Sequence, residues 1–289
     1  MLRVKINFIN RINSGNVTPV IKIQPQKGWI SLRLGELWDY RELIYFLVWR
    51  DIKVRYQQTM LGASWAILQP FLTMVVFSVI FGRLARMPSE GLPYPIFAYT
   101  ALLPWQLFAN GVNKATTSLV SNQPLLTKVY FPRLILPLSA VMGGLVDFGC
   151  AFVVFLGMMF YYGIFPGAAA LLLPLFILFT MTISLSVGLW LSALNVEYRD
   201  VGQAISFLIQ IWLFATPIVY PSSLVPKPWR TLLGLNPMTG VVEGFRWALL
   251  GKGEVTGPLM IVSVLSVSAL LFGGLMFFRR MEKTFADYI

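Results

Sequence analysis

Long runs of apolar residues, separated by short polar segments, fill most of this 289-residue chain. A helix of about 20 residues crosses the ~30 Å hydrocarbon layer of a membrane, because it rises about 1.5 Å per residue. We therefore predict an all-α integral membrane fold with six transmembrane helices per subunit, at residues 63–82, 96–120, 135–162, 170–194, 204–221 and 258–278.

The segment before the first predicted span has a different pattern, in which apolar residues recur at helical spacing between charged ones. Residues 36–56 are rich in tryptophan and tyrosine, which favour the boundary between lipid and water. We predict an N-terminal amphipathic helix in the membrane interface. Residues 1–35 have no sustained apolar core and no signal-peptide pattern. The chain thus divides into a basic cytoplasmic arm, 1–35, and a transmembrane domain, 36–289.

Residues 222–257, just before the last predicted span, are apolar but interrupted. A lipid-exposed helix tolerates such breaks badly, because freed backbone groups find no water in the hydrocarbon layer. We predict a re-entrant hairpin that dips into the membrane from the outer side. The interruptions are Asn236-Pro237, Gly240, Glu243, Gly244 and Arg246.

The net charge of +11 fits a membrane protein better than a nucleic-acid-binding one, because no basic patch stands outside the apolar region. Lys and Arg number 16 in the segments on one side of the predicted spans and 6 on the other. Cytoplasmic loops carry the excess of positive charge. Both termini are therefore predicted to be cytoplasmic, with membrane lipids and no nucleic acid among the partners.

The residues that most enzymes use are scarce in this chain. It has no histidine, and its single cysteine, Cys150, lies in an apolar run. No G-x-x-x-x-G-K-[ST] phosphate loop occurs, so the chain is not expected to bind ATP in that way. We predict no catalytic residue, no metal ligand and no cofactor in this chain.

Asp147 stands in the middle of the third predicted span. A charge at mid-membrane costs about 2.5–3.5 kcal/mol, so this carboxylate should face either a water-filled path or a hydrogen-bonding partner on another helix. Aromatic side chains in the apolar runs are either interface anchors, the commoner role, or the lining of a path for sugars. The candidates for such a path, with Asp147, are Trp105, Phe108, Trp212 and Tyr220.

The cytoplasmic loop between the second and third predicted spans, residues 122–133, combines apolar and basic residues between two prolines. Exposed apolar residues on the cytosolic face mark a docking surface, although burial in lipid is the alternative. The expected docking residues are Leu126, Lys128, Val129, Tyr130, Phe131 and Pro132.

Several motifs, in this order, resemble those of polysaccharide-exporting type-2 ABC transporter permeases, over about residues 36–285. They are Trp49-Arg50-Asp51 with Arg55-Tyr56, Leu61-Gly62, Leu68-Gln69-Pro70, Leu103-Pro104-Trp105, the 126–132 segment, Tyr198-Arg199-Asp200, Thr216-Pro217-Ile218 and Asn236-Pro237. The resemblance implies a homodimer bound to two copies of a separate cytoplasmic ATPase, which would hold ATP and Mg²⁺. It also implies that 36–56 is the interface helix, that 125–132 is the coupling helix on the ATPase, and that 222–257 narrows the outer mouth.

The expected function is therefore export of a lipid-linked polysaccharide (O-antigen, capsule or teichoic acid) across the bacterial cytoplasmic membrane. One alternative is a type-2 ABC permease for drugs or small lipids. A less favoured one is a membrane-embedded lipid-linked sugar transferase. The acidic cluster that such a transferase would use, Glu36, Asp39, Glu42 and Asp51, also suits an interfacial helix.

Overall fold

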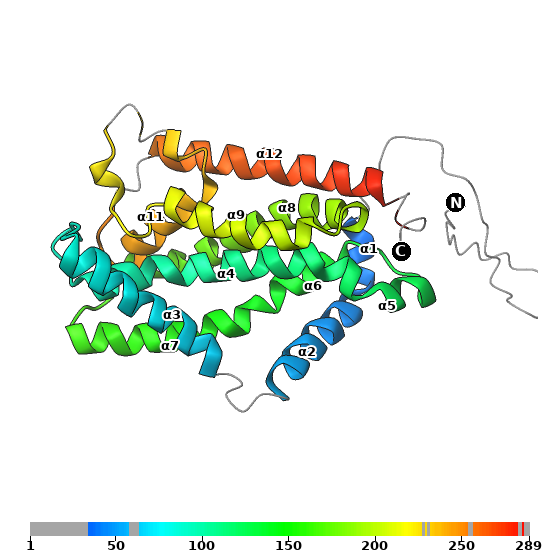
Figure 1. Cartoon of the computed structure of the whole chain (residues 1–289), viewed down its shortest axis with the longest axis horizontal. Coiled ribbons are helices and arrows are strands. Elements are labelled where there is room, and N and C mark those ends of the chain that lie inside the picture. The colour runs from blue at the N-terminus through cyan, green and yellow to red at the C-terminus, as the bar shows by residue number, and fades with distance from the viewer. Residues whose placement is uncertain are drawn as a thin grey trace, which may run out of the picture. The chain divides into compact units, whose positions relative to one another are not determined.

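The structure is a computed structural model that describes residues 34–57, 64–226, 229, 232–253, 257–282 and 285. Nearly all of the predicted arm, 1–35, lies outside the described residues. Within them the chain is helical and contains no strand. Figure 1 shows α1 (Leu34–Asp39), α2 (Arg41–Gln57), α3 (Ser64–Phe77) with its π-helical extension η1 (Ser78–Leu84), α4 (Tyr94–Ser121), α5 (Gln123–Lys128), α6 (Ile135–Met142), α7 (Gly144–Tyr162), η2 (Ala168–Leu172), α8 (Leu173–Glu197), α9 (Val201–Ala215), η3 (Ser222–Leu224), α11 (Pro237–Leu250) and α12 (Gly257–Met281).

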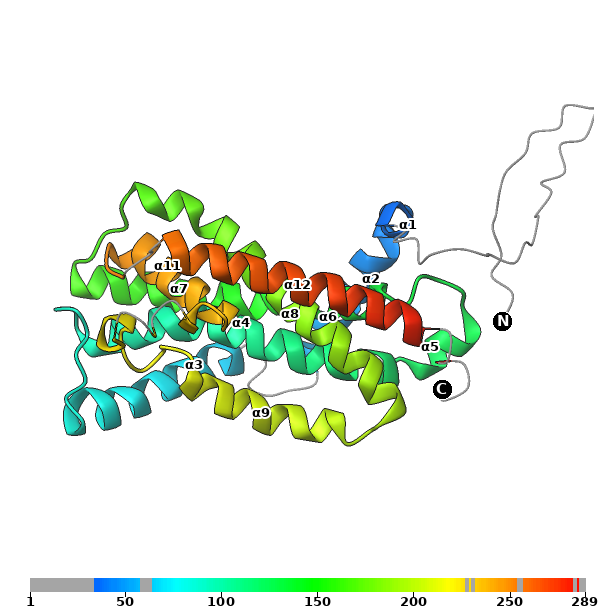
Figure 2. The same cartoon turned by 90° about the horizontal axis from the view of Figure 1, so that it is seen from above.

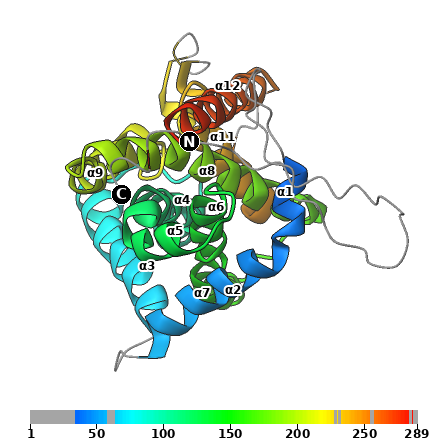
Figure 3. The ribbon, with the colours of Figure 1, turned by 90° about the vertical axis from the view of Figure 1, so that its right-hand side faces the viewer.

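Helix α4 is the centre of the bundle, and the end view in Figure 3 shows the other long helices around it. Its closest neighbour is α8, and small residues bring the two backbones together. Gly111 lies against Ser184, and a Cβ added at Gly188 would be 2.5 Å from the Cβ of Ala115. Small residues at helix contacts are the usual means of close packing in a membrane. The bundle core therefore depends on glycine at position 188.

Among the described residues, four helices are long and apolar enough to cross a membrane: Ser64–Leu84, Ile135–Tyr162, Ala168–Glu197 and Gly257–Met281. These correspond to the first, third, fourth and sixth predicted spans. Helix α4, the second, has 28 residues but carries polar side chains toward its neighbours. Helix α9, the fifth, has 15 residues and ends at Ala215, whereas 204–221 was expected. The all-α membrane fold is confirmed, and the count of six spans stays a prediction.

The expected helix at 36–56 is two helices, because the chain turns at Tyr40. Helix α2 lies across the direction of the bundle helices in Figures 1 and 3. Leu47 anchors it in a core cluster with Ile135 of α6, while Tyr45 and Trp49 are exposed. This orientation and these aromatics fit the predicted position in a membrane interface.

Helix α11 forms the helical part of the predicted hairpin, and it lies at the end of the bundle opposite α2 and α5 (Figures 1 and 2). All of its side chains except Trp247 are buried or nearly so, against α4, α8 and α12. The Asn236 side chain caps the helix by accepting from the amide of Met238 at 3.1 Å. At about 1.5 Å per residue, 14 residues are too short to cross ~30 Å of hydrocarbon.

Candidate functional site

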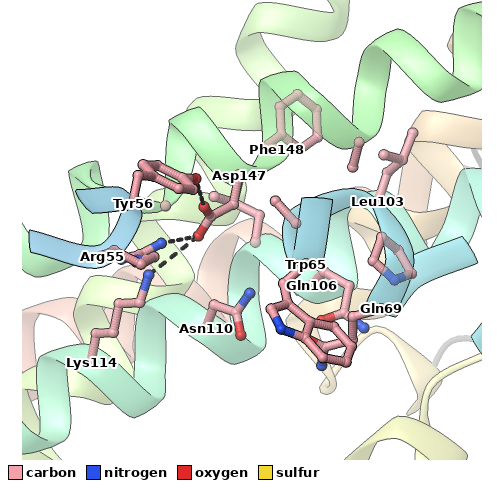
Figure 4. Close-up of a pocket in the computed structure, with 15 residues that line it drawn as sticks. Arg55, Tyr56, Trp65, Gln69, Leu103, Gln106, Asn110, Lys114, Asp147 and Phe148 are labelled. Atoms are coloured by element: carbon pink, nitrogen blue, oxygen red, sulfur yellow. Dashed lines mark hydrogen bonds and ion pairs between the residues drawn. The ribbon is translucent and has the colours of Figure 1, made fainter. Parts of the chain in front are cut away.

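Four charged or hydroxyl side chains from three helices meet at one point in the bundle (Figure 4). Arg55 and Tyr56 lie in the last turn of α2, Lys114 belongs to α4, and Asp147 belongs to α7. Arg55 Nη1 donates to Asp147 Oδ2, and Lys114 Nζ lies 3.3 Å from the same oxygen. The Tyr56 hydroxyl donates to Oδ1. The carboxylate is thus bound through both oxygens, and we call these four residues the Asp147 cluster.

The cluster explains how a charge is tolerated inside an apolar helix. The Asp147 side chain has an exposed fraction of only 15%, and an unpaired carboxylate there would cost far more than a paired one. Two cations face one anion, so the cluster carries a net charge of +1. Burial and the adjacent carboxylate raise the pKa of Tyr56 well above its usual range, which keeps the hydroxyl protonated as a donor.

The Asp147 cluster forms one wall of a cavity of about 250 Å³. Trp65 and Gln69 of α3 and Gln106 and Asn110 of α4 line other walls, as Figure 4 shows. Among the described residues, none of the three side-chain amides has a hydrogen-bond partner in the chain. The cavity therefore offers cations and unused donors and acceptors to a polar, anionic group. Asp147 was expected to face either a hydrogen-bonding partner on another helix or a water-filled path. It has partners on α2 and α4 and also lines this cavity. Its place on a substrate path stays a prediction.

The aromatic residues expected to line a path lie elsewhere. Trp105 and Phe108 are buried in the main core, with ring centroids 5.3 Å apart, and Phe108 packs edge-on against Trp212 at 5.1 Å. The expectation that Trp105 and Phe108 face a path is wrong for this chain, because neighbouring helices cover both rings. Trp212 and Tyr220 are partly buried, and Trp212 Nε1 donates to Asn236 Oδ1 at 3.0 Å.

The expected coupling helix at 125–132 is shorter than predicted. Helix α5 ends at Lys128, because Val129 takes an extended conformation. Val129 and Tyr130 are exposed, Tyr130 by 74%, whereas Phe131 is only 4% exposed and packs in a core cluster with Leu47. We expected Phe131 to be exposed as an anchor, and this expectation is wrong because the ring is buried. Leu126 and Pro132 are partly buried, and Lys128 is exposed.

A hydrogen bond joins the interface helix to the segment that contains α5. Arg50 Nη2 donates to Asn122 Oδ1 at 2.8 Å and also pairs with Asp51 at 2.7 Å. Asn122 in turn donates to the Ser118 carbonyl at the end of α4. Trp49 stays exposed beneath the ammonium of Lys53, 4.6 Å from its ring. This hydrogen bond thus links α2 to Asn122, the residue that precedes α5.

Sequence reasoning missed two ion pairs. Lys114 went unassigned, although a cation and an anion in neighbouring apolar spans are expected to pair. Glu243 and Arg246, interpreted only as interruptions, form a fully buried pair at 3.1 Å. Arg246 also donates to the carbonyls of Pro217 and Ile218, at 2.8 Å each, and lies over the ring of Phe97. Opposite charges three residues apart in an apolar stretch were the available signal.

Comparison with known proteins gives consistent matches over this architecture. Residues 42–250 match the family described as ABC-2 type transporter. The chain is 34% identical to the O-antigen export system permease protein RfbA of Myxococcus xanthus, over 88% of this chain and 98% of that protein. It is 28% identical to the protein of the same name from Klebsiella pneumoniae, over 90% and 98%. It is 24% identical to the polysialic acid transport protein KpsM of Escherichia coli, over 81% and 91%.

Proposed function

Since this chain belongs to the ABC-2 type transporter family, we propose that it is the permease subunit of an ATP-driven exporter that moves a lipid-linked polysaccharide across the bacterial cytoplasmic membrane. The observation that carries the proposal is the similarity to O-antigen export permeases over almost the whole length of both proteins. The family match itself, residues 42–250, runs from α2 to the end of α11. The exported glycan is of the O-antigen or capsule type.

Energy comes from a partner in this proposal. The sequence has no phosphate loop. Two copies of a cytoplasmic ATPase therefore bind ATP and Mg²⁺ and carry out the hydrolysis that drives transport. Val129 and Tyr130 are the exposed apolar residues beside α5, and such residues serve as interface anchors. The Arg50–Asn122 hydrogen bond supports a route by which movement of this segment reaches α2.

A second copy of the chain completes the path. A single copy of the bundle is a thin wall for a glycan path, and a symmetric dimer is the simplest enclosure. The exposed faces of α3 and α9 are apolar, with Phe207, Ile211 and Phe214 exposed on α9, which suits contact with either a second copy or lipid. The lipid-linked glycan enters from the inner leaflet near α2, and closure of the ATPases shifts the two copies apart.

Purification with the candidate ATPase tests the proposal. The expected product is a complex of two permease chains and two ATPase chains, whose ATPase activity depends on the permease. Cells that lack the permease should accumulate lipid-linked glycan on the cytoplasmic side. A monomeric permease that binds no ATPase, or unchanged surface polysaccharide without the gene, would refute it.

A further inference from the structure

A hollow of about 850 Å³ lies between α3–η1 and α7, toward the end of the bundle that holds α11 (Figures 1 and 2). It shares no lining residue with the cavity beside the Asp147 cluster. Each wall is one face of a helix, because its lining residues recur at four-residue steps. The walls include Phe71, Val75, Val79 and Arg83 on α3–η1, and Val154 and Met158 on α7. We call this space the η1 hollow.

The η1 hollow exists because the two helices separate along their length. Helix α3 packs against α7, whereas η1 packs against α4. On the other wall Gly157 lines the space, and a Cβ added there would meet no atom within 4 Å. Phe71 and Val79 remain 40% and 45% exposed, so the hollow opens sideways from a membrane-spanning helix. Apolar walls that open to the hydrocarbon layer favour hydrocarbon over water as the filling.

Polar groups of the hollow gather near one end. Arg83 lies in the last turn of η1, and Tyr161 and Tyr162 lie in the last turn of α7. Among the described residues, Arg83 makes no hydrogen bond or ion pair, and no carboxylate lines the hollow. Tyrosine and arginine at the ends of spans lie at the level of the lipid headgroups. The η1 hollow therefore combines apolar walls with an uncompensated cation at its headgroup end.

The length of the hollow matches one leaflet. From Phe71 to Arg83 the wall is about 18 Å long at ~1.5 Å per residue. Half of the ~30 Å hydrocarbon layer is about 15 Å. A chain that begins at the headgroups of one leaflet and ends near the middle of the membrane would therefore fill the space.

We propose that the η1 hollow binds an anionic phospholipid of the leaflet at that end of the bundle. Its phosphate lies at Arg83, since a guanidinium binds phosphate through two parallel hydrogen bonds. One acyl chain lies between α3–η1 and α7 and supplies the packing that these helices do not give each other. The inference rests on the membrane fold and the hollow, and it is independent of the proposed function.

Two glycines of α7 provide a matched pair of variants for the acyl-chain part. A Cβ added at Gly149, which does not line the hollow, also meets no atom within 4 Å. Gly157→Phe therefore places a ring in the hollow, and Gly149→Phe places the same ring outside it, with the same gain in helix propensity.

Two arginines provide a second pair for the headgroup. Arg83 lines the hollow, whereas Arg86, three residues later and also exposed, does not. Arg83→Gln removes the proposed phosphate partner without enlarging any side chain. Arg86→Gln removes the same charge outside the hollow. This pair decides the question even if Gly157→Phe fails to fold.

The experiment uses the full-length chain in lipid nanodiscs, with phosphatidylglycerol that carries a photoreactive acyl chain as the probe. Phosphatidylcholine with the same chain is the comparison. Peptides of α3–η1 and α7 should be labelled about fivefold more by phosphatidylglycerol, the equivalent of ~1 kcal/mol for one arginine. Leu175 and Leu178, exposed on α8, report ordinary surrounding lipid and should be labelled equally by both.

The variants should separate the two parts of the site. Arg83→Gln should abolish the preference for phosphatidylglycerol, and Arg86→Gln should keep it. Gly157→Phe should remove most labelling of the hollow by either lipid, and Gly149→Phe should not.

Three results would overturn the inference. Equal labelling of the wild-type hollow by the two lipids would exclude an anionic headgroup site. A preference that survives Arg83→Gln would place the headgroup elsewhere. A disulfide between two copies that each carry Val79→Cys, with Cys150→Ser as background, would show that a second copy of the chain occupies the hollow.

Discussion

At the scale of single residues, Asp147 determines whether two cations are tolerated inside the bundle. We expect Asp147→Leu to impair export and protein level, because Arg55 and Lys114, both only partly exposed, lose the carboxylate that they share. Asp147→Asn should be milder, since its amide oxygen still accepts from these donors. Surface glycan and membrane protein level measure both effects. Normal export by the leucine variant at normal protein level would show that the contacts are dispensable.

Arg246 joins α11 to the segment after α9, and its removal should be costly. Arg246→Leu leaves Glu243 unpaired and the carbonyls of Pro217 and Ile218 without their donor. Loss of one partner of a buried ion pair costs about 3–5 kcal/mol. The melting temperature of the purified protein should fall clearly. Lys252→Gln, which removes an exposed charge after the same helix, is the control, and equal melting temperatures for the two variants would contradict this assignment.

The limits of sequence reasoning are clear at this scale. A charge in a predicted span had to find a partner, so the need for contacts around Asp147 was predictable. The partners were not, because Arg55 lies 92 residues away and Lys114 33 residues away, and only the packing of α2, α4 and α7 unites them. Trp105 and Phe131 were misplaced for a related reason. Aromatic composition does not distinguish a ring that lines a surface from one that fills a core.

At the scale of elements, the exposed end of α5 is the expected contact with the ATPase. Because Phe131 is a core residue, truncating it would destabilise the permease as well as any contact with the ATPase. The two effects could not be separated in a measurement of export. We therefore choose Val129→Ala with Tyr130→Ala, which should leave the permease folded. ATPase affinity should fall by about 30-fold or more and export should be lost, because anchor residues contribute ~2 kcal/mol or more. Co-purification and surface glycan measure the two effects.

The matched control for this pair is Phe165→Ala with Leu171→Ala. These residues are at least as exposed but lie in the connection between α7 and α8, which is predicted to be on the outer side. ATPase binding should be unaffected by this change. If the Val129/Tyr130 variant also keeps full binding and export, the segment is a connector in lipid, as the alternative interpretation held.

Elements were predicted well where apolar length alone decides them. The helices at Ile135–Tyr162 and Gly257–Met281 agree closely with the expected spans. Errors arose where packing or a turn residue intervenes. Helix α9 stops before Thr216-Pro217, whose proline cannot continue the backbone pattern. The interface helix breaks at Tyr40 without a proline or glycine to mark the place, so the sequence carried no signal for it.

At the scale of the whole molecule, the charge count of 16 against 6 predicts an orientation across the membrane with both termini cytoplasmic. Helices α2 and α5 lie at one end of the bundle and α11 at the other (Figures 1 and 2), as the predicted topology requires. With Cys150→Ser as background, we expect Pro88→Cys to react with an impermeant thiol reagent in intact cells and Thr127→Cys to be protected. Both positions are exposed. The reverse result would invert the orientation.

The most direct test of the account is transport by a purified system. The permease and its ATPase are reconstituted in vesicles with a labelled lipid-linked glycan on the ATPase side, and a glycosidase inside the vesicles reports arrival. We predict cleavage that requires ATP and stops when the ATPase is catalytically inactive. ATP-dependent movement of small lipophilic drugs with no cleavage of the glycan would contradict the account and identify a drug or lipid permease instead.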